Sequence, residues 1–230
     1  EDVSSRIKKN PQTGLLGINI GPNKNTKDRV KDYLIGFRIF HKIADYITIN
    51  ISSPNTENLR NFHDQSKLEK LLDKIQNEKK ILKSNIPIVV KIAPDIIDSE
   101  IEKISEVLLI KKIDAVIISN SSDGSRENLK DIKKYQKGGL SGKPLEDKSN
   151  LLINKFYKNF KGKIKIIGVG GVDSGLGAYN KFLSGADLIQ LYTGMVYKGP
   201  DIVNLIKNDL TKLLLRDGIK NFKEIIGKKN

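Results

Sequence analysis

The sequence predicts an α/β fold, a (β/α)8 TIM barrel of which about six of the eight βα units are visible in its 230 residues. Short runs rich in Ile and Val alternate regularly with longer amphipathic stretches, which is typical of parallel strands joined by helical crossovers. Polar residues and glycines gather where these apolar runs end, at six successive places. This distribution favours a barrel over a doubly wound sheet, which concentrates its site at one switch point.

Each expected strand is nearly continuous in apolar residues, as strands buried on both faces are. The expected strands are Leu15–Ile20, Tyr46–Ile51, Pro87–Ile92, Ala115–Asn120, Ile164–Val169 and Leu188–Tyr192. The amphipathic stretches predict the helices Lys27–Ile43, Gln65–Lys83, Ser99–Lys111, Lys148–Asn159, Gly177–Ser184 and Ile202–Arg216. Asp98 and Ser99 precede Ile101 and are candidate caps for the third helix.

The visible strands are too few to close a barrel, which needs eight. The residues up to Thr13 are polar and contain no strand candidate, and no repeat, linker or low-complexity segment indicates a second domain. We therefore expect residues 1–230 to form a single barrel domain that is incomplete at its N-terminus. Either the chain is truncated at its N-terminus or the barrel is completed in some other way, and truncation is the simpler explanation.

The composition excludes several classes of site. Without cysteine there are no disulfides, thiolate zinc sites or cysteine nucleophiles, and with only His41 and His63 no metal site is expected. No apolar run approaches the roughly 20 residues that span a bilayer, and the first residues lack the apolar core of a secretion signal. Acid–base chemistry must then use Ser, Thr, Tyr, Lys, Asp or Glu.

The net charge of +14 allows three interpretations. Clustered basic residues bind nucleic-acid phosphates, and basic surfaces are attracted to anionic membranes. Alternatively, the charge is spread over solvated helix faces. We favour the last interpretation, because the basic residues are scattered and pairs such as Lys79-Lys80 have an acid nearby, here Glu78. No aromatic-rich RNA-binding motif accompanies them, so nucleic acid is not an expected partner.

The segment Asn50–Thr56 (Asn-Ile-Ser-Ser-Pro-Asn-Thr) carries the strongest chemical signal. Asn side chains both donate and accept hydrogen bonds, as the imide and amide edges of a pyrimidine require. A serine in a water-poor loop can accept a proton if its neighbours support the charge. An ordinary Ser-Pro-Asn turn explains the same residues, and spacing alone leaves both interpretations open.

The segment Tyr46–Thr56 resembles the active-site strand and loop of dihydroorotate dehydrogenases. The family pattern continues with Pro-Gly-Leu-Arg where this chain has Glu57–Arg60 (Glu-Asn-Leu-Arg), a departure that would alter how the loop covers the substrate. Further segments resemble the family in the same order, so the resemblance covers nearly the whole chain. They are Leu16–Gly21, Val90–Asp95, Gly138–Leu145, Ile167–Asp173, Leu191–Gly194 and Lys198–Pro200.

The resemblance implies oxidation of (S)-dihydroorotate to orotate in pyrimidine (UMP) synthesis, with FMN as the hydride acceptor. Ser53 would be the general base that removes a proton from C5. A sister class places Cys at this position, whereas serine is similar to the class that a quinone reoxidises at a membrane. Asn50 and Asn55 would hold the pyrimidine, together with Asn120 and Ser121.

The resemblance also assigns the residues that would bind FMN. Lys91 would lie beside the flavin ring, where a cation stabilises the anionic reduced form. A solvent-facing lysine at a strand end is the alternative, although Lys91 is a lone charge in a buried strand. Asn19, Asn50 and Ser119 would donate or accept hydrogen bonds at the flavin. The phosphate would bind at Gly142, Gly171, Tyr192 and Thr193.

The family's N-terminal part supplies two strands, further flavin contacts and a membrane-resting segment that forms the quinone tunnel, and we expect this chain to lack them. The expected location is peripheral to a membrane, at the cytoplasmic face of a bacterial inner membrane, or at the mitochondrial inner membrane in a eukaryote. Two alternatives stay open. One is another FMN-dependent barrel oxidoreductase, such as a tRNA dihydrouridine synthase, although those enzymes place a cysteine at the acid position. The other is a truncated, non-catalytic barrel fragment.

Overall fold

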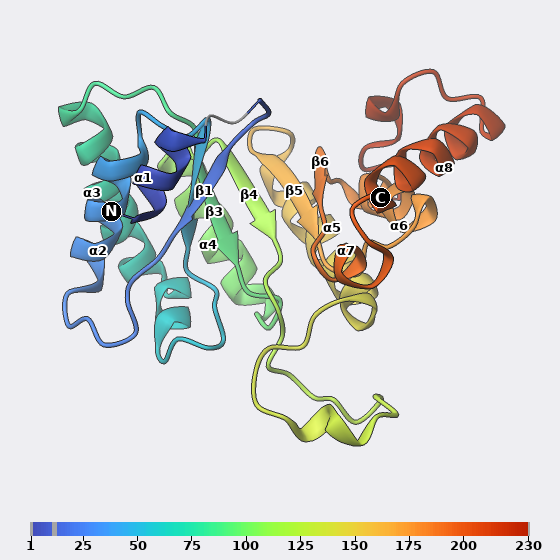
Figure 1. Ribbon diagram of the computed structural model, residues 1–230, viewed down its shortest axis with the longest axis horizontal. Coiled ribbons are helices and arrows are strands. Elements are labelled where there is room, and N and C mark those ends of the chain that lie inside the picture. Colours follow the sequence, from blue (N-terminus) through green and yellow to red (C-terminus); the bar gives the residue numbers. More distant parts are fainter. Residues whose placement is uncertain (1, 11–12, 230) are drawn as a thin grey trace.

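The computed structural model describes residues 2–10 and 13–229, and in them one parallel sheet follows the order β1-β2-β3-β4-β5-β6 (Figure 1). Its strands are β1 (Gly17–Ile20), β2 (Tyr46–Asn50), β3 (Ile88–Ile92), β4 (Ala115–Ile118), β5 (Lys165–Val169) and β6 (Leu188–Gln190). Each strand pairs with the next one along the chain, and the order never reverses as it does in a doubly wound sheet. The predicted α/β class is confirmed, and the strands end within two residues of the predicted limits.

Helices cover the outer side of the curled sheet (Figure 1). The longer ones are α2 (Arg29–Phe40), α3 (Gln65–Ile81), α4 (Asp98–Ile110), α5 (Glu146–Phe160), α6 (Gly175–Ser184) and α8 (Ile202–Arg216). These are the six predicted helices: α8 has the predicted limits, and each of the others is shifted at one or both ends. The sequence patterns missed two α-helices and four short 3-10 helices: α1 (Asp2–Lys9), α7 (Thr193–Lys198), η1 (Leu59–His63), η2 (Ile132–Tyr135), η3 (Lys143–Leu145) and η4 (Phe222–Ile225).

The predicted caps of α4 are wrong. Asp98 is the first residue of the helix, and its carboxylate forms an ion pair with Lys155 of α5. The cap position is Ile97, whose backbone N–H donates to the side chain of Glu100 at 2.9 Å. The helix begins one residue earlier than expected because a glutamate in its first turn reaches back to this orphan donor.

Side chains alternate between the two faces of the sheet, and this alternation places the polar residues. In β3, Val90 and Ile92 face outward into the main core beneath the helices, whereas Val89 faces the concave interior. Lys91 shares the inward face with Val89 because side chains two apart in a strand lie on the same face. The register pairs Lys91 with Asn50, so both polar residues lie at the same end of the interior.

The concave interior holds a small apolar cluster that consists of Val89, Ala115, Ile117 and Ile167. Tyr46 packs against this cluster, and its hydroxyl accepts a hydrogen bond from Nε2 of Gln190 at 3.2 Å. This bond links β2 to the end of β6 across the curl of the sheet. Within the described residues β1 and β6 are edge strands, as expected for a sheet that does not close on itself.

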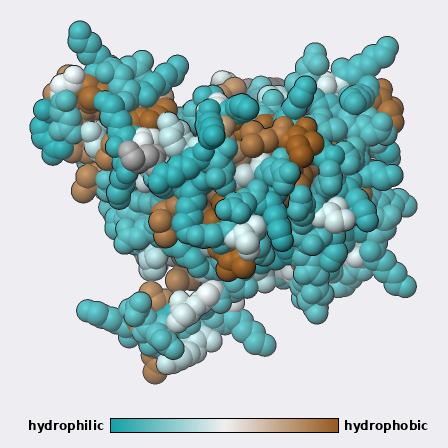
Figure 2. All heavy atoms as spheres, turned by 180° about the vertical axis from the view of Figure 1, so that it is seen from behind, coloured by the Kyte–Doolittle hydropathy of each residue, from teal (hydrophilic) through white to brown (hydrophobic). Residues whose placement is uncertain are grey.

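Hydrophilic side chains cover most of the face seen in Figure 2, and the loop between β4 and α5 projects from the body. Apolar groups appear on this face as patches between them. Among the described residues, none of the helices combines the length and the apolar character needed to cross a membrane.

A fully buried lysine, Lys181 of α6, lies beneath the ends of β4 and β5. Its Nζ donates to Ser149 Oγ at 3.1 Å and to Asn150 Oδ1 at 3.0 Å, and Ser149 Oγ donates to the carbonyl of Val169 at 2.6 Å. Both partners of the ammonium group are neutral. Burial therefore lowers the pKa of Lys181 to about 8, and Glu146 offsets only part of this effect.

This buried lysine makes the stability of the protein pH-dependent. An unfolded lysine keeps its proton up to a pKa of roughly 10.4, so between pH 8 and about 10 the unfolded state binds more protons than the native state. The free energy of unfolding is therefore expected to rise by about 2 kcal/mol over this range. Urea unfolding of the wild type and of Lys181→Met at several pH values measures the effect, which the variant should lack. If the free energy of unfolding changed with pH in the same way in the wild type and in Lys181→Met, this prediction would be contradicted.

Candidate active site

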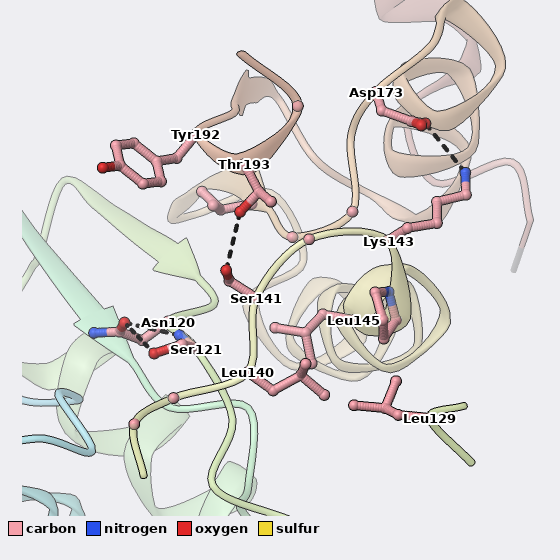
Figure 3. Close-up of a pocket in the computed structure, with 18 of the residues that line it drawn as sticks. Asn120, Ser121, Leu129, Leu140, Ser141, Lys143, Leu145, Asp173, Tyr192 and Thr193 are labelled. Carbon is pink, nitrogen blue, oxygen red and sulfur yellow. Dashed lines mark hydrogen bonds and ion pairs between the residues drawn. The ribbon is translucent and has the colours of Figure 1, made fainter. Parts of the chain in front are cut away.

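A cavity of about 900 Å³ opens at the carboxyl ends of the strands from β3 to β6. Figure 3 shows Asn120 and Ser121 on one side of it and Thr193 and Tyr192 on another. Strand ends and the loops that follow them form the walls of this cavity. Parallel α/β folds place their sites at this end of the strands. Eight predicted site residues line the cavity: Lys91, Ser119, Asn120, Ser121, Gly142, Gly171, Tyr192 and Thr193.

Lys91 lies in the cavity wall and is only partly accessible to solvent. No carboxylate or other hydrogen-bond acceptor in residues 2–10 and 13–229 contacts its Nζ. Burial lowers the pKa of Lys91, because the charged form loses hydration. Lys91 is therefore a cation without a protein partner among the described residues, and it lines the cavity.

Asn120 joins the cavity to the loop that follows β2. Its Nδ2 donates to Ser52 Oγ at 2.9 Å and to Asn50 Oδ1 at 3.4 Å, and its Oδ1 accepts from the backbone N–H of Ser121 at 2.8 Å. Ser52 Oγ in turn donates to Asn50 Oδ1 at 2.9 Å. These amide and hydroxyl groups hold one another in place, so the ends of β2 and β4 present a preorganised set of donors and acceptors.

Four predicted residues lie outside the lining of this cavity, as far as the described residues define it: Asn19, Asn50, Ser53 and Asn55. Asn50 is in contact with the lining residue Asn120, as described above. Ser53 follows the buried Ser52, and its Oγ accepts from the backbone N–H of Asn55 at 3.3 Å. Asn55 is exposed, and Asn19 is exposed in the edge strand β1.

Two glycines shape the opposite wall of the cavity. Gly142 has φ +83°, and a Cβ there would lie 2.8 Å from Cγ2 of Thr193. Gly171 has φ +78°, and a Cβ there would lie 2.8 Å from the backbone nitrogen of Glu146. Side chains are excluded at both positions by backbone conformation and by space. Beside these glycines, Thr193 Oγ1 donates a hydrogen bond to Ser141 Oγ at 3.0 Å (Figure 3). The ring of Tyr192 is largely exposed.

Basic residues outnumber acidic ones among the charged residues that line the cavity. They come mainly from the projecting loop between β4 and α5, and two acidic residues, Asp131 and Asp173, accompany them. The basic lining residues are Lys91, Arg126, Lys130, Lys133, Lys134, Lys137, Lys143 and Lys198. A concave surface lined by one sign of charge raises the local concentration of ligands of the opposite sign, so the cavity favours an anion.

Sequence patterns missed the role of Arg60, which contacts the ends of three strands. Its guanidinium donates to the carbonyls of Ser52 and Ser121 and to the carboxylate of Asp95. In the preceding turn, where the sequence departs from the family pattern, Asn58 adopts the left-handed conformation with φ 56°. Asparagine tolerates this conformation better than other residues with a side chain.

The two histidines lie outside the cavity lining. His63 belongs to η1 and is buried, and its Nε2 accepts from the backbone N–H of Ala93 at 3.3 Å. Burial and, to a smaller extent, the Arg60 charge lower the pKa of His63 to about 4, so the ring is neutral at neutral pH. His41 follows α2 and stacks on Phe37.

A family model described as dihydroorotate dehydrogenase matches residues 1–214. The chain belongs to the dihydroorotate dehydrogenase family. A protein from Bartonella tribocorum named dihydroorotate dehydrogenase (quinone) is 40% identical over 227 residues, which are 96% of this chain and 63% of that protein. A protein of the same name from Idiomarina loihiensis is 42% identical over 216 residues, 91% of this chain and 64% of that protein. The chain thus spans less than two thirds of the length of these curated relatives.

Solved structures of this family confirm the barrel fold. The dihydroorotate dehydrogenase of Eimeria tenella in complex with ferulenol superposes with a TM-score of 0.91 at 33% identity, and the match covers 99% of this chain and 65% of that one. The ligand-free form of the same protein gives a TM-score of 0.91 and covers 100% of this chain and 68% of that one. The six strands described here therefore form part of a TIM barrel.

Proposed function

We propose that the protein oxidises dihydroorotate to orotate with FMN as the hydride acceptor and a quinone as the final electron acceptor, in the synthesis of pyrimidines. Curated relatives carry the name of this reaction. The observation that carries the proposal is the hydrogen-bond network of Asn50, Ser52 and Asn120, which joins the serine loop to the cavity that Lys91 lines. In this proposal, the base Ser53, the amide groups for a pyrimidine and the cation of Lys91 would act together at neighbouring strand ends.

The residues of the cavity fit FMN. A volume of about 900 Å³ is in the range of cofactor pockets, and a half-buried lysine without a partner suits an electron-rich ring. Lys91 and Ser119 would hold the ring, together with Asn19 and Asn50. The surface around Gly142 and Gly171, where a Cβ would collide with the chain, would admit the phosphate beside Tyr192 and Thr193. Bound FMN would accept the hydride from C6 of dihydroorotate.

The loop after β2 would carry the proton transfer. Ser53 Oγ would take the proton from C5 of dihydroorotate; Ser53 directly follows Ser52, whose hydroxyl is hydrogen-bonded to Asn50, and its own Oγ accepts from the backbone N–H of Asn55. Asn50 and Asn55 would bind the pyrimidine from this loop, while Asn120 and Ser121 would bind it from the end of β4. Basic side chains around the cavity would attract the substrate carboxylate.

The proposal extends to the partner that removes the electrons. A quinone is confined to a membrane, so the protein would act at a membrane surface: the cytoplasmic face of a bacterial inner membrane, or the mitochondrial inner membrane in a eukaryote.

The absorbance of the purified full-length protein tests the proposal. A flavin band is expected, and anaerobic addition of (S)-dihydroorotate should bleach it until a quinone restores it. A protein that binds no flavin, even when FMN is supplied, would contradict the proposal. A flavin band that dihydroorotate leaves unchanged would instead indicate another FMN-dependent barrel oxidoreductase.

A further inference from the structure

The guanidinium of Arg60 joins the ends of three neighbouring strands. Its Nε donates to the carbonyl of Ser52 at 3.3 Å, in the loop after β2. Its Nη2 donates to the carbonyl of Ser121 at 3.0 Å, in the loop after β4, and its Nη1 donates to Asp95 Oδ2 at 3.1 Å, in the loop after β3. Nη1 also contacts the carboxylate of Asp123. One side chain therefore sets the spacing of loops that are far apart in the sequence.

Asp95 completes the arrangement from the other side. Its carboxylate accepts from Ser122 Oγ at 2.5 Å and from the backbone N–H of Asp123 at 3.0 Å, and it forms an ion pair with Lys148 of α5. Burial alone would raise the pKa of Asp95, but hydrogen bonds from Lys148, Ser122 and Asp123 outweigh burial and hold that pKa well below its usual range. The carboxylate is thus ionised over the whole working pH range and keeps Arg60 in place.

The residues on either side of Arg60 in η1 are anchored as well. Leu59 is buried, with 2% of its surface exposed, and His63 accepts from the backbone N–H of Ala93 at the end of β3. Arg60 therefore projects from a fixed segment rather than from a mobile loop. Its fork of N–H donors is planar and rigid, whereas a lysine presents a single point of charge. A lysine at this position would donate hydrogen bonds to only some of the acceptors that Arg60 binds.

We infer that Arg60 is a positioning residue for the proposed reaction. It holds the loop that carries Ser53 at a set distance from the strand end that carries Asn120 and Ser121. The peptide carbonyls that it binds belong to Ser52, directly before the proposed base, and to Ser121 itself. Because an error of about 1 Å between reacting groups costs on the order of 100-fold in rate, a shift between these loops is expected to slow catalysis. This inference rests on the proposed function.

The test compares Arg60→Lys with Arg38→Lys in the full-length protein. Arg38 is the matched control, since it binds the Glu78 carboxylate with two N–H groups at 2.7 and 2.8 Å on the outer helices. Stopped-flow measurement at saturating dihydroorotate is expected to show flavin reduction at least tenfold slower in Arg60→Lys and within twofold of wild type in Arg38→Lys. Both variants should retain flavin. Amide hydrogen exchange should rise at residues 52–57 and 119–123 in Arg60→Lys alone.

A milder second variant is Asp123→Asn, whose carboxylate is largely exposed and which leaves the contacts of Arg60 with Asp95 and the two carbonyls intact. It should give a smaller loss of rate in the same direction. Unchanged rates and unchanged exchange in Arg60→Lys and Asp123→Asn would overturn the inference. If dihydroorotate fails to reduce the wild type, the proposed function fails, while the exchange measurement still decides whether Arg60 orders the two loops.

Discussion

Replacement of Ser53 by alanine is expected to slow the reduction of bound flavin by dihydroorotate by roughly 10²- to 10⁴-fold, the range that a positioned general base contributes. The variant should keep its flavin, because Ser53 does not line the cavity that fits the cofactor. Anaerobic stopped-flow absorbance measures both quantities in one experiment. Ser125→Ala is the control, because this exposed serine lies in the projecting loop and should leave the rate unchanged.

A cysteine at the same position sharpens this test. Ser53→Cys should recover part of the lost rate, because a thiolate also accepts a proton. Its rate should rise with pH through the thiol pKa of roughly 8.5, since only the thiolate is a base. A Ser53→Ala variant that reduces flavin at the wild-type rate would show that another group takes the proton.

Replacement of Lys91 by methionine is expected to slow flavin reduction by roughly 10²- to 10³-fold, as the loss of one preorganised electrostatic group does. Methionine keeps much of the side-chain volume in the wall of the cavity and removes the charge. Since this cation has no protein partner among the described residues, its effect should fall on the ligand. The reduction potential of the bound flavin should become more negative, and titration against a reference dye measures it.

Lys165→Met is the matched control for Lys91→Met. Lys165 begins β5 at the opposite end of the sheet, and its Nζ pairs with Asp187 at 2.8 Å. Loss of the Lys165 charge should change neither the rate of flavin reduction nor the reduction potential of the bound flavin. Equal potentials in the wild type and in Lys91→Met would show that the charge of Lys91 does not act on the flavin.

The features that could be predicted from sequence follow from local periodicity. Lys91 stands within Ile-Val-Val-Lys-Ile, and side chains alternate along a strand, so its inward orientation follows once the strand is recognised. Asn50 and Ser119 follow from the same rule at the ends of β2 and β4. Parallel strands bring their carboxyl ends to one side of the sheet, which explains why residues from four strands meet at one cavity.

The features that could not be predicted depend on contacts between distant loops. Arg60 contacts Asp95, Ser121 and Asp123, which lie 35 to 63 residues further along the chain. The residues next to Arg60 in the sequence do not indicate these partners. Lys181 has the sequence context of an ordinary surface lysine, yet helix packing buries it beneath β4 and β5. The expected capping of α4 was wrong for a local reason, since the helix already begins at Asp98 and Glu100 accepts from the backbone N–H of the cap residue Ile97.

The unreversed strand order has a consequence for how the chain acquires its structure. Because strands that are adjacent in the sheet are also consecutive along the chain, each new strand can pair with a strand that has already been synthesised. The loop that must close at each step is one helical crossover, and the entropy lost on closing it grows only slowly with its length. The sheet can therefore assemble unit by unit from β1 toward β6, and the hydrogen bond between Tyr46 of β2 and Gln190 of β6 cannot form until β6, the last of these strands, is in place.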